Sequence, residues 1–279
     1  MNRLCDLHTH STFSDGTYTP EEIIDKSIEI GLSAVALCDH NTVDGIPNFL
    51  TAATNKDIEA VPGAEFSVDY NGVELHLLGL FMPAEYLGQI TQLMSEVNAR
   101  KEKSNIDLID ALRKDGIILD YEKIKAETPT GKVNRAHIAA ALTQEGYTHS
   151  IKEAFSSLLS KDAGYYNEPK RLTVWEMIDF ILDIKAVPVL AHPFLNLSFE
   201  QLATFLPLAK KRGLIGMECQ YSLYDKSTTQ TALELAKRFE LKPSGGSDFH
   251  GAIKQDINLG VGKGQLQIPY EWFLNLKHN

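Results

Sequence analysis

Two histidines near the start of the chain stand two residues apart, in the stretch DLHTHSTFSDG that covers residues 6–16. On a β-strand, alternate side chains point to the same face, so the imidazoles of His8 and His10 could reach one point. This spacing suits a metal ion, and Asp15 follows closely enough to turn back toward the pair. One such pair in a chain with nine histidines is weak support by itself, so the hypothesis depends on other stretches.

Further histidines and carboxylates follow later apolar runs of the sequence. AVALCDH ends in Asp39 and His40, IEAVPGAE in Glu65, VPVLAH in His192, and PSGGSDFH in Asp248 and His250. His76, in VELHLLG, lies inside a run and joins the set only if that strand extends deeper. The candidate metal ligands are His8, His10, Asp15, His40, Glu65, His76, His192, Asp248 and His250.

The chemistry of these nine side chains indicates which metals they could bind. Imidazole combined with carboxylate suits Zn, Mn or Fe better than Mg or Ca alone. Nine ligands exceed what one tetrahedral or octahedral ion accepts, so we expect two or three divalent ions. Asp6, on the same strand face as His8, is a candidate hydrogen-bond partner for an imidazole N–H, unless it is simply a capped, buried aspartate. Asp39 could serve similarly, although strand alternation points it away.

The elements that must position these residues follow a βα pattern. Apolar runs such as RLCDLH and SAVALCDH alternate with helical patterns such as PEEIIDKSIEIGL, in which Thr19 is the expected N-cap and Gly31 the stop. The pattern returns after residue 167 and suggests a parallel α/β barrel. Because the carboxyl ends of parallel strands open on one face of a barrel, residues far apart in the sequence would meet there.

Between residues 86 and 167 the strand patterns disappear and the sequence is helical throughout. We therefore expect a barrel domain formed by residues 1–85 and 168–279. Residues 86–167 would form an inserted helical subdomain that covers the active site. No internal repeat or low-complexity linker marks the two boundaries.

The composition and net charge limit the classes of protein to which this chain can belong. The 279 residues are 43% hydrophobic and 23% charged, which is typical of a globular domain, and no long apolar span or leader is present. The net charge of −10 argues against a DNA-binding surface and against an anionic membrane as partner. We expect a cytoplasmic protein. Its three cysteines, Cys5, Cys38 and Cys219, are expected to be buried thiols rather than a disulfide framework.

Six stretches, in order, resemble the polymerase and histidinol phosphatase (PHP) family of metal-dependent phosphoesterases. They are DLHTHSTFSDG, CDHNTVDG, PGAEFS, ELHLLG, AHP and GSDFHG, and together they span nearly the whole chain. The resemblance implies a distorted barrel of seven β/α units with a trinuclear metal site. Mn²⁺ is the usual activating ion in that family, and Zn²⁺, Fe²⁺ or Mg²⁺ could take its place.

The resemblance also implies how the ligands divide among the ions. His8, His10 and Asp248 would hold one ion, and Glu65 would bridge it to another. Asp15, His40 and His250 would hold the second ion, whereas Glu65, His76 and His192 would complete the third. Asp15, Glu65, His192 and Asp248 are the residues expected to act in catalysis.

The insert resembles that of small PHP phosphatases acting on nucleoside 3′,5′-bisphosphates, some of which trim short RNA from its 5′ end. The stretch that carries this resemblance is VNRAHIAAAL, in which Arg135 is the first candidate to bind the second phosphate of the substrate. Lys161, in SKDAGYYNEP, is a second candidate for phosphate binding. A nucleotide or short RNA is therefore the expected partner, and the oligomeric state stays open.

The expected reaction is hydrolysis of a phosphate monoester by a hydroxide that bridges two ions, without a phosphorylated enzyme residue. Three alternatives remain at this stage. The first is a histidinol-phosphate or other small-monoester phosphatase of the same family. The second is a PHP domain retained as a structural module, and the third is an amidohydrolase acting on C–N bonds.

Overall fold

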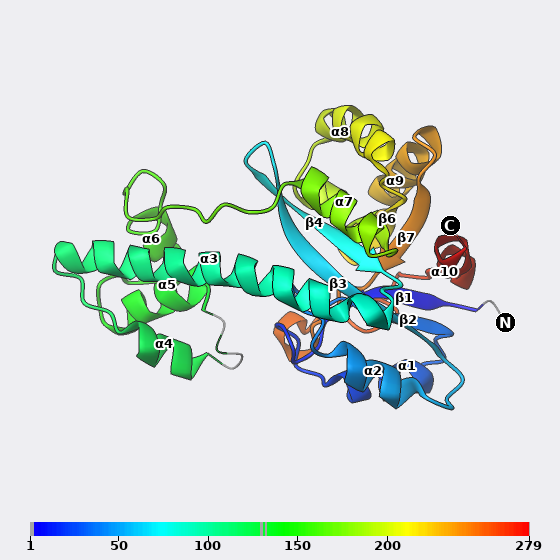
Figure 1. Cartoon of the computed structure of the whole chain (residues 1–279), viewed down its shortest axis with the longest axis horizontal. Coiled ribbons are helices and arrows are strands. Elements are labelled where there is room, and N and C mark those ends of the chain that lie inside the picture. Colours follow the sequence, from blue (N-terminus) through cyan, green and yellow to red (C-terminus); the bar gives the residue numbers. More distant parts are fainter. Residues whose placement is uncertain (1–2, 129–130, 132, 279) are drawn as a thin grey trace. The chain divides into compact units, whose positions relative to one another are not determined.

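The computed structural model describes residues 3–128, 131 and 133–278 (Figure 1). The chain divides into two compact units. One unit comprises Met1–Thr91 and Leu172–Asn279 and is an α/β barrel, and the other, Gln92–Arg171, is helical. The domain boundaries expected after residues 85 and 167, and a cover over the site, stay predictions.

The barrel is one seven-stranded sheet whose order in space follows the chain, from β1 to β7. The strands are β1 (Cys5–Thr9), β2 (Ala34–Leu37), β3 (Glu59–Tyr70), β4 (Val73–Leu80), β5 (Val187–Leu190), β6 (Gly216–Tyr221) and β7 (Lys242–Gly246). The chain beyond β7 returns to β1, where the amide of Asp248 donates to the carbonyl of His8 at 2.9 Å. The barrel is thereby nearly closed, and the expected fold class is confirmed.

The expectation that all strands are parallel is wrong for one strand. β4 runs antiparallel to both of its neighbours, β3 and β5. The reason is the turn Asn71–Gly72, in which both residues have positive φ, 52° and 82°. An Asn-Gly pair of this kind connects antiparallel strands in a tight hairpin. β3 and β4 therefore form a hairpin instead of another β/α unit.

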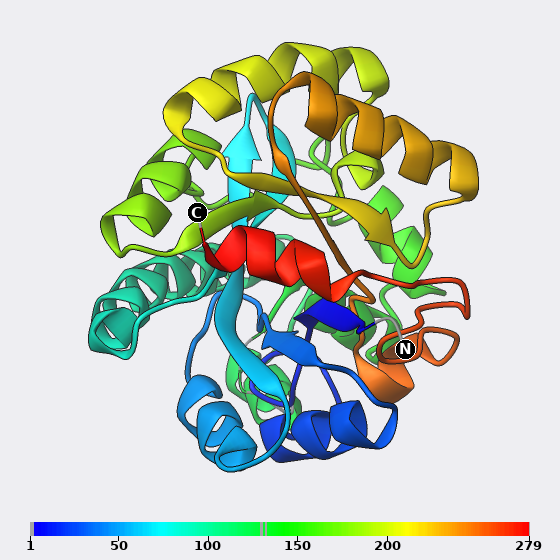
Figure 2. The ribbon, with the colours of Figure 1, turned by 90° about the vertical axis from the view of Figure 1, so that its right-hand side faces the viewer.

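Helices flank the barrel, and Figure 2 shows α1 and α2 on one side of the strands, and α8 and α9 on the other. The helices of this unit are α1 (Pro20–Glu29), α2 (Ile46–Ala53), α7 (Val174–Asp183), α8 (Phe199–Arg212), α9 (Lys226–Arg238) and α10 (Tyr270–Lys277), with the short 3-10 turns η1 (Ala84–Tyr86), η2 (Pro193–Leu195) and η3 (Gly251–Lys254). Thr19 caps α1 through a reciprocal pair of hydrogen bonds with Glu22, as its sequence predicts.

The last helix, α10, lies across the amino-terminal end of the barrel (Figure 2). Its Phe273 and Leu276 are fully buried in the same core cluster as Cys5, at the start of β1. α10 therefore covers part of this end of the barrel. The three cysteines are buried free thiols, as expected.

The helical unit is built on α3 (Leu87–Lys114), which begins in the barrel unit and runs into Gln92–Arg171. Three shorter helices follow: α4 (Tyr121–Glu127), α5 (Arg135–Gln144) and α6 (Ile151–Ser156). They share a separate apolar core that includes Leu108, Leu112, Ile138 and Leu142. Within the described part of residues 87–171 no strand is present, so the helical character of this segment is confirmed.

Gly246 at the end of β7 provides a test of how tightly β7 packs against β1. A Cβ added there would lie 2.7 Å from the backbone nitrogen of His8, and this backbone cannot move without disturbing β1. We expect Gly246→Ala to lower the free energy of unfolding by about 1–3 kcal/mol, measured by urea denaturation. Gly88→Ala is the control, because space around Gly88 is open and alanine is the better helix former. Equal stability of the two variants would contradict this packing.

Candidate metal centre

The candidate ligands gather at the end of the barrel where the parallel strands have their carboxyl ends. Strand β1 carries His8, whereas His192 follows β5, and Asp248 and His250 follow β7. The expectation that Glu65 ends its strand is wrong, since β3 continues to Tyr70. The same extension explains His76, because antiparallel β4 starts beyond the site and pairs His76 with Ser67. The strand thus extends deep enough to bring His76 to the other ligands.

The fully buried carboxylate of Glu65 is the centre of this group. Its Oε1 lies 2.7 Å from Nδ1 of His76 and 2.9 Å from Nε2 of His192. Its Oε2 lies 3.2 Å from Nε2 of His8 and 3.1 Å from Nδ1 of His40. One carboxylate from β3 therefore meets imidazoles from four other segments of the chain.

The side chains form three overlapping groups in which one nitrogen or oxygen from each residue lies within 4.8 Å of the others. The groups are His8, His10, Glu65 and Asp248; His10, Asp15, His40 and His250; and His40, Glu65 and His76. His192 joins through its contact with Glu65. The structure thus brings all nine candidates together, with His10, His40 and Glu65 each in two groups.

Asp15 stands on the most exposed side of this cluster, with 51% of its side chain accessible. Its Oδ1 lies 3.4 Å from Nε2 of His250, and its Oδ2 lies 3.8 Å from Nε2 of His40. Both separations are longer than an ordinary hydrogen bond of about 2.7–3.2 Å. They leave room for an ion between the donors.

Several donor atoms of the cluster have no hydrogen-bond partner although they are buried. Among the described residues these include Oε2 of Glu65 and Nδ1 of His10 and of His192. A buried polar atom without a partner is costly. Divalent cations would provide the missing contacts, and the imidazole and carboxylate donors suit Zn, Mn or Fe. The residues therefore fit the metal ions expected from the sequence.

Electrostatics also favours cations at this point. Burial raises the pKa of the Glu65 carboxyl, but the imidazoles of His40 and His76 outweigh burial and hold the pKa well below its usual range. Burial and the imidazoles of His10 and His8 oppose each other in the same way at Asp248, whose pKa is also held well below its usual range. Both carboxyls are therefore anionic at neutral pH.

The backbone is unusual at two of the ligands. His192 has φ 26° and Asp248 has φ 55°, a region that residues other than glycine rarely adopt. Such strain persists only where surrounding contacts impose it, and it is concentrated at functional sites. Both residues lie two positions beyond the end of a strand, β5 or β7.

Three residues near the ligands escaped the sequence analysis. The hydroxyl of Tyr221 donates to Oδ2 of Asp248 at 2.8 Å, and the ammonium group of Lys254 lies 2.6 Å from the same oxygen. Glu218, fully buried in β6, contacts both His8 and His192. Only Glu218 could have been suspected from the sequence, because it is a charged residue within the mostly apolar stretch GMECQY.

Asp6 is not the partner of an imidazole, and the alternative of a capped aspartate is correct. Its carboxylate accepts from the backbone amides of Ser247 at 2.9 Å and Gly260 at 2.8 Å. Asp39 is turned away from the ligands, as strand alternation predicts. It accepts from the amide and hydroxyl of Ser11, and so fixes the turn after His10.

The two candidate phosphate-binding residues both lie in the helical unit. The guanidinium group of Arg135, at the start of α5, stacks 4.4 Å from the centre of the Tyr166 ring. The side chain of Lys161 is 72% exposed and lies 3.3 Å from Glu168. Their roles in phosphate binding stay predictions.

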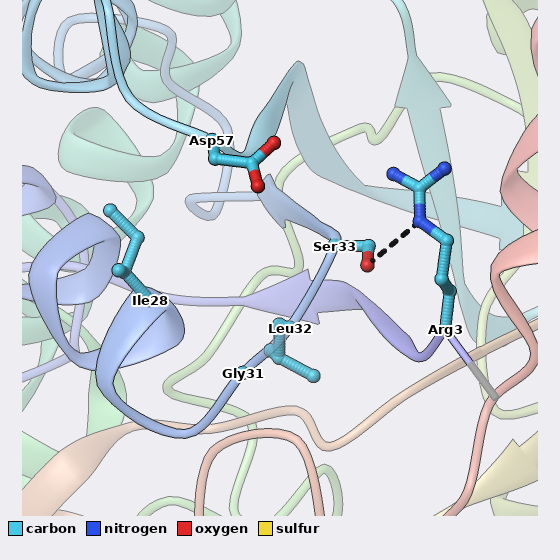
Figure 3. A pocket seen from close by; sticks show the side chains of 6 residues that line it. All are labelled: Arg3, Ile28, Gly31, Leu32, Ser33 and Asp57. Atoms are coloured by element: carbon cyan, nitrogen blue, oxygen red, sulfur yellow. Dashed lines mark hydrogen bonds between the residues drawn. The ribbon is translucent and has the colours of Figure 1, made fainter. Parts of the chain in front are cut away.

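A pocket elsewhere in the barrel unit is not part of this site. It is lined by residues such as Arg3, Ser33 and Asp57, which precede strands β1, β2 and β3 (Figure 3). It therefore lies at the opposite end of the barrel from the ligands. The guanidinium group of Arg3 is already bonded to Ser33 and stacked on Tyr270.

Across the described residues, no helix has the length and apolar character needed to cross a bilayer.

Comparison with known protein families shows to which family the chain belongs. Residues 6–180 match the family model described as "PHP domain", which is more than half of the chain. The chain belongs to the PHP family. A putative metal-dependent phosphoesterase from Bifidobacterium adolescentis has a similar structure, with a TM-score of 0.75, 25% identity, and coverage of 98% of this chain and 95% of that one.

Three curated relatives of this PHP protein act on different phosphate esters. The chain is 32% identical to the 5′-3′ exoribonuclease of Haemophilus influenzae, over 94% of this chain and 96% of the relative. It is 27% identical to a 3′,5′-nucleoside bisphosphate phosphatase of Chromobacterium violaceum, over 88% and 86%. It is also 27% identical to a phosphoribosyl 1,2-cyclic phosphate 1,2-diphosphodiesterase of Eggerthella lenta, over 91% and 97%. The PHP protein is a metal-dependent phosphoesterase.

The contact between Tyr221 and Asp248 gives a test of the ligand cluster. We expect Tyr221→Phe to lower the free energy of unfolding of the chelator-treated protein by about 1.5 kcal/mol, because a hydrogen bond to a carboxylate is lost while Lys254 remains. Urea denaturation measures this change. Tyr18→Phe, at a ring that packs on Phe249, is the control for loss of a hydroxyl. A Tyr221→Phe variant as stable as the control would show that the bond contributes nothing.

Proposed function

We propose that this PHP protein hydrolyses the 3′-phosphate of nucleoside 3′,5′-bisphosphates, using two or three divalent ions, with Mn²⁺ the first candidate. The observation that carries the proposal is the convergence of nine imidazole and carboxylate side chains at one end of the barrel, with Glu65 at their centre. The relative from C. violaceum, named for this substrate, supports the choice. Removal of the 3′-phosphate would leave a nucleoside 5′-monophosphate.

When bound, the ions would supply Lewis acidity and lower the pKa of water to near neutrality. The chain itself supplies the donors: His8, His10 and Asp248 for one ion, and Asp15, His40 and His250 for a second. Glu65, His76 and His192 would hold a third. Every well-placed histidine is then occupied as a ligand, so we assign no protein nucleophile and no side-chain acid for the leaving group.

The distribution of charge supports different roles for the two units in binding an anionic substrate. Of the 27 Lys and Arg residues in the chain, 13 lie in Gln92–Arg171, which holds only 12 of the 37 Asp and Glu residues. The helical unit therefore has a net charge of +1. The barrel unit carries 14 basic and 25 acidic residues and has a net charge of −11. An anionic substrate depends on the ions in the barrel and on cationic side chains such as Arg135 in the insert.

A second candidate function is removal of nucleotides from the 5′ end of short RNA. The relative from H. influenzae favours it, since that exoribonuclease matches 94% of the chain. Both functions need an anion-binding group for a phosphate that is not cleaved. They differ in whether the group attached to the scissile phosphate is another nucleotide.

Phosphate or nucleotide release from a panel of substrates tests these functions. With Mn²⁺ present, the panel holds adenosine 3′,5′-bisphosphate, AMP, histidinol phosphate, phosphoribosyl 1,2-cyclic phosphate and a short 5′-phosphorylated RNA. We expect the highest kcat/KM on the bisphosphate and loss of activity with a chelator, restored by Mn²⁺. Preference for RNA would select the second candidate. Preference for histidinol phosphate or the cyclic phosphate would contradict both.

Arg135 gives a sharper prediction about substrate choice. If its guanidinium group binds the phosphate that is not cleaved, Arg135→Ala should lower kcat/KM for the bisphosphate about 10- to 100-fold, which is the value of one charged hydrogen bond. Its effect on a simple monophosphate should be small. Arg113→Ala, in the same unit, is the control for removal of a guanidinium group. Equal losses of Arg135→Ala on both substrates would remove the role of Arg135 in binding this phosphate.

A further inference from the structure

Glu218 is a buried carboxylate that contacts two candidate ligands from separate strands. It lies in β6 with 0% of its surface exposed. Its Oε1 lies 3.0 Å from Nδ1 of His8, and its Oε2 accepts a 2.6 Å hydrogen bond from the backbone amide of His192. One side chain therefore contacts a ligand within β1 and a ligand that follows β5.

The contact with His8 fixes which ring nitrogen faces the cluster. When Nδ1 carries the proton and donates to Glu218, Nε2 of His8 has a free lone pair. That nitrogen lies 3.2 Å from Oε2 of Glu65, inside the ligand group. A carboxylate behind an imidazole also raises its strength as a metal ligand.

The contact between Glu218 and His192 involves the backbone of His192 and not its imidazole. His192 has φ 26° and ψ 55°, so its chain turns sharply after β5. The short bond from its amide to Glu218 holds that turn in place. In this conformation Nε2 of His192 lies 2.9 Å from Oε1 of Glu65.

We propose that Glu218 is a positioning residue that couples two parts of the metal centre, the part that contains His8 and the part that contains His192. The inference rests on the proposed metal site and adds a selective effect to it. Glu218 makes no contact of this kind with the group formed by Asp15, His40 and His250, as far as the described residues show. Loss of its charge should weaken binding of the ions held by His8 and by His192, and spare the ion held by Asp15, His40 and His250.

Glutamine cannot replace Glu218 in this role, although it has the same shape. If its amide oxygen accepts from His192, its NH₂ group faces Nδ1 of His8 and selects the tautomer in which Nε2 carries the proton. If the amide is flipped, two donors face each other at His192. In either orientation one candidate ligand loses its orienting contact.

Titration calorimetry of the chelator-treated full chain with Mn²⁺ tests the proposal, with Glu218→Gln compared to wild type. We expect dissociation constants 10- to 100-fold higher at the affected positions and at least one ion bound as in wild type. Glu234→Gln is the control, because it removes the same charge from an exposed site on α9. Circular dichroism checks that the variants are folded.

The outcomes separate this inference from the proposed function. A wild-type chain that binds no Mn²⁺ would overturn both. A folded Glu218→Gln variant with wild-type affinities, or one that loses every ion equally, would overturn the role of Glu218 alone.

If Glu218→Gln does not fold, the wild type still provides a test. Nitrogen NMR of ¹⁵N-histidine in the zinc-loaded protein, assigned with His8→Asn, should show His8 protonated at Nδ1. A proton on Nε2 instead would contradict the proposal.

Discussion

The structure depends on the burial of one carboxylate among imidazoles. Glu65 is shielded from water, and its two oxygens face histidines that come from β1, β2, β4 and β5. A buried anion of this kind is stable only if positive charge or hydrogen-bond donors surround it. The barrel satisfies this requirement with groups drawn from four separate segments of the chain. The site is therefore complete only when these segments of the barrel are folded together.

Much of this site could be predicted from the sequence, because it follows a rule of topology. Residues after β1, β2, β5 and β7 meet since those strands have their carboxyl ends at one mouth of the barrel. The rule fails for His76, which lies inside a strand, and the error traces to the Asn71–Gly72 turn that reverses β4. An Asn-Gly pair between two apolar runs is a recognisable hairpin signal, so this part could have been found.

The contacts around the ligands are harder to predict, since they depend on the register between strands. Whether Glu218 or Asp6 stands behind His8 is decided by how β1 lies beside β7 and β6, and single residues do not show this. Asp6 instead accepts from the amides of Ser247 and Gly260, which lie more than 240 positions away in the sequence. Long-range backbone hydrogen bonds leave no local pattern. The sequence therefore identifies the metal ligands better than it identifies the residues that hydrogen-bond to those ligands.

The place of the insertion has a consequence for how such proteins diversify. Residues 92–171 enter between β4 and α7, and all nine candidate ligands lie outside this stretch, within the barrel unit. Replacement of the insert would leave all nine candidate ligands in place, while it removed the side chains, such as Arg135, that we propose to bind the rest of the substrate. On that proposal, natural selection or a protein engineer could exchange the insert for another one without rebuilding the metal ligands of the barrel.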